Sequence, residues 1–180
     1  MQLRISRNFA GLGLALALLL AAAPAPAEPQ EPSEQELDDT SFAKSFIGKN
    51  YDGELDIEGW TDLGGGLVTP PIYVRYYQRG DGTYLVLTSR ELAKATRNAP
   101  ANFAVADALI VRPPKGGAEF TISCVQGKDE MLRYMGVAKG PVEKEWWTDV
   151  RQAWEISAET GEIKSVKAKG VRCTNISWGQ

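Results

Sequence analysis

The chain has 180 residues, 43% of them hydrophobic, and a formal net charge of -3 at pH 7. This acidic balance argues against nucleic acid as a partner, because neutralising phosphates requires clustered Lys and Arg. The chain contains no histidine, which excludes Ser-His-Asp and Cys-His nucleophile pairs and the usual His-containing zinc and copper sites. We therefore expect no cofactor, and the composition favours a non-enzymatic protein.

Residues 1–27 have the features of a secretory signal peptide. Arg4 and Arg7 precede an apolar run over residues 9–23, and the Ala-Pro-Ala of residues 25–27 has the small-x-small pattern of a cleavage site. The run is shorter than the roughly 20 apolar residues that a membrane anchor needs. We predict cleavage after residue 27, a periplasmic or secreted location, and a mature chain with no integral membrane segment. Loss of two arginines and no acid would change the formal charge from -3 to -5.

Residues 28–40 are rich in acids and contain Pro29 and Pro32, with almost no large apolar side chain. This composition predicts a disordered spacer. Residues 41–180 are expected to form a single domain, since a mature length of about 150 residues suits one hydrophobic core. At its start, residues 41–47 are long enough for one short helical turn.

Residues 51–60 alternate between apolar and acidic side chains, which predicts a half-buried strand. Two segments rich in Tyr, Val, Ile and Leu, residues 72–78 and 83–88, flank a turn-forming Arg-Gly-Asp-Gly and predict a β-hairpin. Thr88 and Glu91 have the spacing of a capping box. A short helix is therefore expected over residues 89–98.

A second hairpin is predicted from residues 105–111 and 118–125, and a third from residues 153–157 and 162–167, each around a Gly-containing turn. Residues 142–154 are ambiguous. Their apolar side chains recur every four residues, which favours a helix, but Trp, Val and Thr are also strand formers. We predict a helix there and a last strand over residues 171–178.

These elements predict a mainly β fold, with α+β as the alternative. The expected architecture is a single antiparallel sheet or a small sandwich of about seven strands, with one or two short helices. Cys124 and Cys173 are the only cysteines. In an oxidising compartment an even count indicates a disulfide, which would close a loop of about 50 residues.

The acids of the predicted strand over residues 51–60 have two interpretations. They are the solvated face of an edge strand, or they bind a calcium ion as an approximate EF-hand loop. The loop departs from the EF-hand pattern, because it begins with Glu and has Gly65 where a bidentate Glu is required. The candidate metal ligands are Glu54, Asp56, Glu58 and Asp62.

Three short motifs are expected to be incidental. Ser41 and Lys44 have S-x-x-K spacing, but the other elements of that hydrolase class are absent. The Arg-Gly-Asp of residues 79–81 lies in a predicted turn, where these residues are common. The glycosylation-type sequence of residues 175–177 lies in a predicted strand.

The chain holds five tryptophans, and indole rings bind sugars and peptides as well as fill cores. We predict a ligand-binding aromatic patch formed by Trp60, Trp146 and Trp147, with core filling as the alternative. The resulting hypothesis is a small exported, non-enzymatic binding or interaction domain, whose partner is a glycan, a peptide or another envelope protein. The alternative function is a carboxylate-based hydrolase acting on an envelope glycan.

Overall fold

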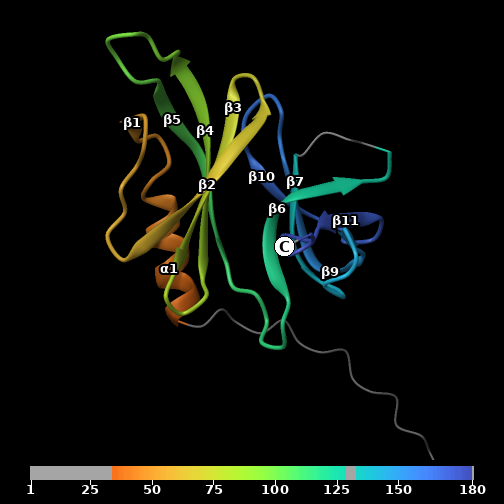
Figure 1. Cartoon of the computed structure of the whole chain (residues 1–180). Helices are drawn as coiled ribbons and strands as arrows, with labels where there is room; N and C mark the ends of the chain where they lie inside the picture. The colour runs from red at the N-terminus through yellow and green to blue at the C-terminus, as the bar shows by residue number, and fades with distance from the viewer. Residues whose placement is uncertain (1–33, 129–132, 180) are drawn as a thin grey trace, which may run out of the picture. The chain divides into compact units, whose positions relative to one another are not determined.

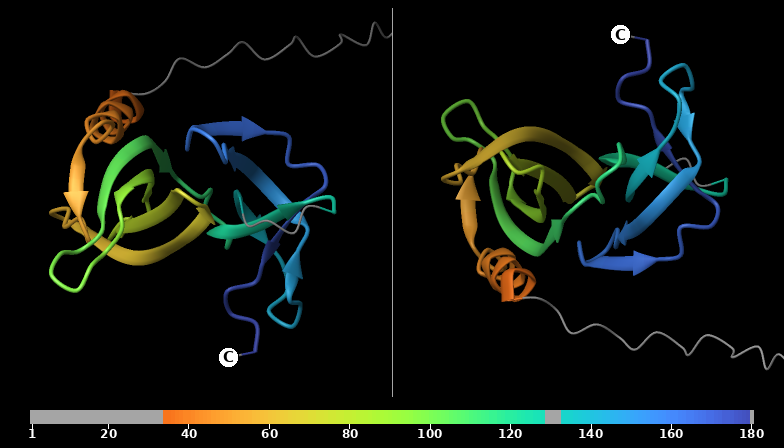
Figure 2. Two further views of the ribbon diagram at one scale, coloured as in Figure 1. Left: turned by 90° about the horizontal axis from the view of Figure 1, so that it is seen from above. Right: turned by 90° about the horizontal axis from the view of Figure 1, so that it is seen from below.

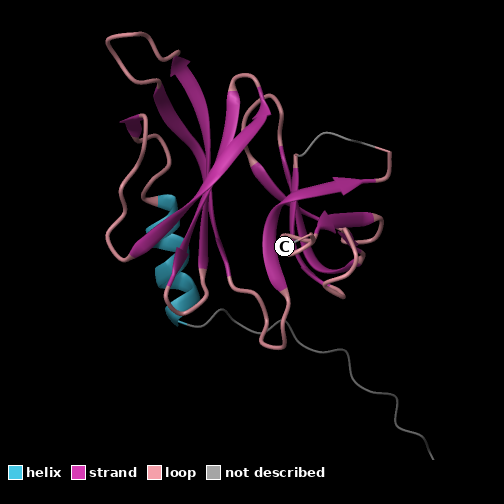
Figure 3. Cartoon of the chain, viewed as in Figure 1, coloured by secondary structure: helices cyan, strands magenta, loops and turns pink. Residues whose placement is uncertain are grey.

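The computed structural model describes residues 34–128 and 133–179, and all of them belong to the unit that spans residues Pro32–Gln180. The described residues form one helix and eleven strands (Figures 1 and 3). The mainly β prediction is confirmed. The predicted signal peptide lies outside the described residues. Within the described part of the chain, no helix is long and apolar enough to cross a membrane.

The first sheet is antiparallel and has five strands in the order β1-β5-β4-β3-β2. Its strands are β1 (Asn50–Asp52), β2 (Trp60–Thr69), β3 (Ile72–Arg79), β4 (Tyr84–Ala93) and β5 (Asn102–Val111). The second sheet is also antiparallel and has six strands in the order β10-β9-β7-β6-β11-β8. Its strands are β6 (Glu119–Gln126), β7 (Tyr134–Lys139), β8 (Trp146–Trp147), β9 (Asp149–Ile156), β10 (Ile163–Val166) and β11 (Val171–Thr174).

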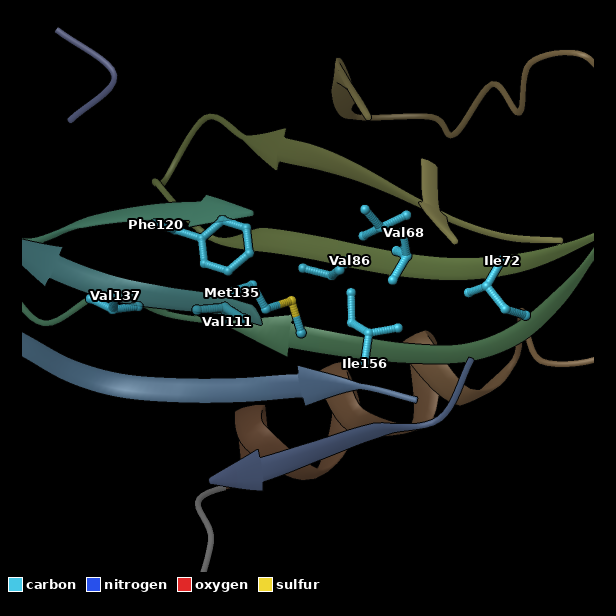
Figure 4. Close-up of a cluster of buried hydrophobic side chains, with 9 residues drawn as sticks. Val68, Ile72, Val86, Val111, Phe120, Met135, Val137 and Ile156 are labelled. Carbon is cyan, nitrogen blue, oxygen red and sulfur yellow. The ribbon is translucent and has the colours of Figure 1, made fainter. Parts of the chain in front are cut away.

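The two sheets pack through a shared hydrophobic core, which Figure 4 shows. Every second residue of a strand points to the same face, and on both sheets one face carries Val, Ile, Phe and Met. This arrangement matches the sandwich alternative of the sequence-based prediction. The core residues labelled in Figure 4 are Val68, Ile72, Val86, Val111, Phe120, Met135, Val137 and Ile156.

Polar contacts also join the sheets at the turn between β9 and β10. The Thr88 hydroxyl donates a hydrogen bond of 2.6 Å to the Gly161 carbonyl, and the Ile163 amide donates one of 2.8 Å to Asp107 Oδ2. Gly161 has a φ of 80°, and a Cβ there would stand 2.9 Å from the Ala106 Cβ. Glycine at this turn therefore lets the third hairpin approach the first sheet closely.

The face of the first sheet away from the second sheet, here called its outer face, has a core of its own. Tyr77, Leu85, Leu87 and Val105 are buried there beneath Phe46, which follows helix α1 (Glu34–Lys44). Figure 2 shows α1 and β1 on this side of the sheet. Ala43 of α1 and Phe46 thus cover part of the outer face.

Helix α1 corrects the prediction of a disordered spacer, because residues 34–40 are helical. The rest of that spacer, residues 28–33, lies outside the described residues. The helix is polar along most of its length, but Asp39 forms ion pairs with Arg79 and Arg112. Its position is thus fixed by contacts with distant residues that local composition does not reveal.

The strand predicted over residues 51–60 is also wrong for most of its length. The strand β1 ends at Asp52, and the chain turns at Gly53, which has a φ of 64°. Leu55 and Ile57 still pack in the outer-face core, although no strand ladder holds them. The apolar residues of this segment alternate with acids because their side chains are buried in the outer-face core, and not because the segment forms a strand.

Two predicted helices are strands. Residues 89–93 continue β4, which pairs with β5 as far as Ala93, and residues 142–154 contain β8 and β9. In β8, Trp147 pairs with Cys173. Cross-strand partners from elsewhere in the chain override the local helical pattern in both segments.

The first and third predicted hairpins are confirmed as β3–β4 and β9–β10. The second has the correct strands but the wrong pairing, because β5 pairs with β4 and β1 whereas β6 pairs with β7 and β11. The segment between β5 and β6 crosses from one sheet to the other. The predicted disulfide between Cys124 and Cys173 is confirmed.

Candidate functional site: a cleft on the first sheet

A cleft of about 310 Å³ opens on the first sheet, where its two end strands, β1 and β2, approach each other. Its volume lies at the lower end of the range of clefts that bind small ligands, roughly 300–1,000 Å³. Four strands and the turn after β1 contribute to the lining. The lining residues are Tyr51, Gly53, Gly65, Gly66, Leu67, Tyr73, Val74, Arg75 and Phe103.

Three half-buried aromatic rings form the apolar part of this cleft. The Tyr51 and Phe103 rings stack with centroids 5.3 Å apart, and the Tyr73 ring meets Phe103 edge-on at 5.3 Å. The Tyr51 hydroxyl donates a hydrogen bond of 3.0 Å to Ser89 Oγ. Burial raises the pKa of Tyr51, so its hydroxyl stays protonated at neutral pH.

A charged cluster adjoins the same cleft through Arg75, which lines it. Arg75 Nε lies 2.8 Å from Asp62 Oδ2, and Arg75 Nη2 lies 3.3 Å from Glu54 Oε1. Arg75 Nη1 also donates to the Gly53 carbonyl at 3.4 Å. The guanidinium on β3 thus links β2 to the turn after β1. The formal charges of Arg75, Asp62 and Glu54 sum to one negative charge.

Tyr77 lies two residues beyond Arg75 on β3 and so points to the same face. Its side chain is 1% exposed, and its hydroxyl has no hydrogen-bond partner among the described residues. Burial raises the pKa of Tyr77, and the negative charge of Asp62 raises it further. A buried neutral hydroxyl therefore lies close to the charged cluster and retains the capacity to donate and accept hydrogen bonds.

The β2 side of the cleft is formed by the backbone of Gly65 and Gly66 and by the side chain of Leu67. A Cβ at Gly65 would stand 2.1 Å from the Val74 carbonyl oxygen, so packing requires this glycine. Gly66 differs: nothing lies within 4 Å of its Cβ position, and its φ is not in the left-handed region. A strand glycine that local packing does not require leaves the backbone accessible to another chain or a ligand.

The structure does not bring the three tryptophans of the predicted patch together. Trp60 lies on the first sheet and stacks on Phe42 with centroids 5.8 Å apart, whereas Trp146 and Trp147 form β8 of the second sheet. Trp147 is 4% exposed, and its indole N–H donates to the Pro141 carbonyl at 3.1 Å. Trp147 therefore fills the core, as the alternative interpretation stated.

Trp146 is half-buried, and the Arg172 guanidinium lies 4.5 Å from the centre of its ring. Trp60 is also half-buried, with the Arg79 guanidinium 5.1 Å from its ring. Each ring thus has one face covered by an arginine of the chain. That either indole binds a ligand stays a prediction.

The four candidate calcium ligands do not lie on one strand face. Glu54 and Asp62 approach the same guanidinium, that of Arg75, while Asp56 and Glu58 are exposed between β1 and β2. Across residues 34–128 and 133–179, no group of three or more His, Cys, Asp or Glu side chains is placed to hold a metal ion. The positive charge between Glu54 and Asp62 takes the place that a cation would need.

The cleft itself was not predicted from the sequence, although part of the signal is local. Tyr73, Arg75 and Tyr77 alternate along one strand, which places an arginine between two tyrosines on the same face. Tyr51 and Phe103 come from two other strands. Their contribution depends on the pairing of β1 with β5.

Comparison with protein-family models, with curated proteins and with solved structures gives no match for this chain. Its function is therefore inferred from the cleft and from the residues that line it.

Proposed function

We propose that the protein is a non-enzymatic binding domain whose ligand occupies the cleft on the first sheet. The observation that carries this proposal is the combination of three aromatic rings with a charged cluster and a buried, unpartnered tyrosine hydroxyl nearby. Binding clefts typically join a mostly apolar wall to a few convergent polar groups. The site differs from the predicted tryptophan patch, but the class of function is the same.

We further propose that the domain works in the periplasm or outside the cell. Two features support this location: the signal-peptide pattern of residues 1–27 and the disulfide between Cys124 and Cys173. Disulfides persist in oxidising compartments and are rare in the reducing cytosol. A ligand of the cleft is accordingly expected among molecules of the cell envelope.

The side chains around the cleft do not favour the hydrolase alternative. A glycosidase needs two carboxyl groups that face the substrate from opposite sides of the scissile bond. Here Glu54 and Asp62 both pair with Arg75, which lies between them. Their shared partner holds them as a structural ion-pair cluster rather than as a separated acid and base.

Nuclear magnetic resonance of the full chain, expressed with its own N-terminal segment, tests the binding proposal. The probes are chitotetraose, muramyl dipeptide and a lysine-containing hexapeptide, added separately. We expect at least one probe to shift the amide signals of Gly53, Gly65 and Gly66, because these residues line the cleft. The proposal would be overturned if the probes shift only amide signals of residues other than these glycines.

Two alanine variants separate the cleft from the tryptophan surface. Tyr73→Ala removes an aromatic wall of the cleft, and Trp146→Ala removes a half-buried ring on the second sheet. We expect Tyr73→Ala to weaken binding and Trp146→Ala to leave it unchanged. The reverse result would assign the ligand to the second sheet.

A further inference from the structure

We propose that the ligand of the cleft is an extended, basic segment of a partner polypeptide, which pairs with the free edge of β2 and places a Lys or Arg side chain in the cleft. This inference rests on the proposed function, because it names the chemical class of ligand for the same cleft. Its support comes from the strand edge, the bare backbone and the surrounding charge.

The strand β2 is an open edge of the first sheet. It pairs with β3 on one side, and in the described part of the chain no strand pairs with its other side. The N–H and C=O groups of an edge strand can hydrogen-bond to another extended chain. Proteins commonly block such edges with Lys or Pro, but residues 61–69 contain no Lys, Arg or Pro.

The exposed apolar residues of β2 support the inference that its edge pairs with another chain. Leu63 and Leu67 expose 40% and 49% of their surface, and Leu67 also lines the cleft. Register shifts divide the β2–β3 ladder into regular stretches at residues 60–62 and 65–67, of which the second borders the cleft. The paired stretch is therefore short, and contacts of a side chain within the cleft must supply part of the affinity.

The position of the cleft suits a polypeptide. It lies between β2 and β1, which are the two end strands of the sheet, and the glycines Gly53, Gly65 and Gly66 expose backbone along it. A segment added to β2 would run through this space. Gly66, which local packing does not require, lies at the middle of the regular stretch over residues 65–67.

The charge beside the cleft favours a cationic side chain. Arg75 lines the cleft, and the two carboxylates that pair with it, those of Asp62 and Glu54, lie just outside the lining, so the cluster keeps one negative charge at the border of the cleft. The faces of the neighbouring aromatic rings also attract cations. A Lys or Arg side chain satisfies both features, since its apolar stem packs on rings while its charged head reaches carboxylates.

The buried hydroxyl of Tyr77 lies beside the charged cluster, behind the lining of the cleft. Tyr77 pairs with Asp62 across the β2–β3 ladder, and its hydroxyl has no hydrogen-bond partner among the described residues. A buried polar group without a partner is uncommon in folded proteins. Tyr77 is not among the residues that line the cleft, so a donor on the ligand meets this hydroxyl only if binding opens a path to it.

Isothermal titration calorimetry with three matched peptides tests the inference on the full chain in its oxidised form. The probe is acetyl-Thr-Val-Lys-Val-Thr-amide, the charge control replaces Lys by Glu, and the backbone control carries N-methyl groups on the Lys and on both Val residues, which blocks both edges of the peptide. We expect the Lys peptide to bind at least about tenfold more tightly than either control. Equal affinity for the Lys and Glu peptides, or for the N-methylated peptide, would overturn the inference.

Two pairs of variants locate the interaction. Leu67→Lys is expected to weaken binding of the Lys peptide and Leu67→Glu to maintain or strengthen it, because the two changes differ only in charge at the edge. Asp62→Asn should weaken binding about tenfold. Its matched control is Asp149→Asn on the second sheet, where Asp149 pairs with Arg151 at the same 2.8 Å. Equal losses from Asp62→Asn and Asp149→Asn would contradict the proposed site.

Other outcomes distinguish the inference from the proposed function. If chitotetraose or muramyl dipeptide shifts the Gly65 and Gly66 signals while no peptide binds, the inference fails and the binding function stands. If no probe reaches the cleft, both fail. If size-exclusion chromatography shows a dimer that Leu67→Lys converts to a monomer, the edge pairs with a second copy and the inference is overturned.

Discussion

Cys124 on β6 and Cys173 on β11 lie directly opposite each other on neighbouring antiparallel strands, with Cα atoms 4.0 Å apart, and their sulfurs form the disulfide. Both residues are fully buried in the hydrophobic cluster of the second sheet. The bridge therefore joins the last strand of the chain to the middle of that sheet. It ties together residues separated by 49 positions in the sequence.

The double variant Cys124→Ala/Cys173→Ala should lower the free energy of unfolding by about 4 kcal/mol, the chain-entropy value for a loop of this length. Guanidinium unfolding followed by tryptophan fluorescence measures the change. Wild-type protein under a reducing agent is the control and should be destabilised in the same direction. An unchanged unfolding midpoint in both samples would show that strand pairing alone holds β11.

Gly136→Ala should destabilise the second sheet by about 1–3 kcal/mol through overpacking. A Cβ at this position would lie 3.0 Å from Cys173 Sγ and 3.4 Å from Cys124 Sγ. Gly66→Ala is the matched control, because its Cβ meets nothing within 4 Å, and its effect should stay within about 0.5 kcal/mol. Thermal unfolding of both variants tests the difference, and equal melting temperatures would contradict it.

The parts of the fold that the sequence predicted are those with local signals. The β3–β4 and β9–β10 hairpins each combine two apolar segments with a turn of suitable residues, so neighbouring segments pair. The same logic failed for β5 and β6, whose strand signals are equally clear. Nothing between them indicates that the chain passes to the other sheet.

The candidate site was less predictable, because it is assembled from pairing. Tyr51 meets Phe103 only because β1 pairs with β5, and Phe103 in turn meets Tyr73 from β3. The binding patch was predicted at tryptophans because the chain contains many of them. In the structure, Trp147 fills a core and Trp60 packs against Phe42. The residue type alone did not show whether an aromatic side chain lines a binding surface or packs in the interior.

Asp39→Asn should detach helix α1 from the first sheet. The Asp39 side chain is 11% exposed and pairs with Arg79 and Arg112, and an Asn cannot balance their charges. Loss of hydrogen bonds to a charged group of this kind costs about 2 kcal/mol. Hydrogen exchange of the α1 amides should accelerate. The exposed neighbour Asp38 provides the control, and equal exchange in Asp38→Asn and Asp39→Asn would contradict the anchoring role.

We expect Asp81 to contribute to a fall in the free energy of unfolding at acid pH. Hydrogen bonds from Arg79 and from the Thr83 amide lower the pKa of Asp81 from 3.8 to about 2. The folded state thus favours the charged carboxylate, so this contribution is complete above about pH 4 and is lost as the pH falls through 2. Urea unfolding between pH 5 and 2 should show a smaller loss of stability in Asp81→Asn than in the wild type. Parallel curves for the two proteins would contradict this assignment.

Tyr77→Phe should separate stability from binding. The hydroxyl of Tyr77 is buried without a partner among the described residues, so its removal should leave the free energy of unfolding unchanged or raise it by about 1 kcal/mol. If the ligand supplies the missing hydrogen bond, the same variant should bind the Lys peptide more weakly. Chemical unfolding and calorimetry on one sample measure both quantities. A destabilised variant would instead show that the hydroxyl already has a partner, such as an ordered water, and that its role is structural.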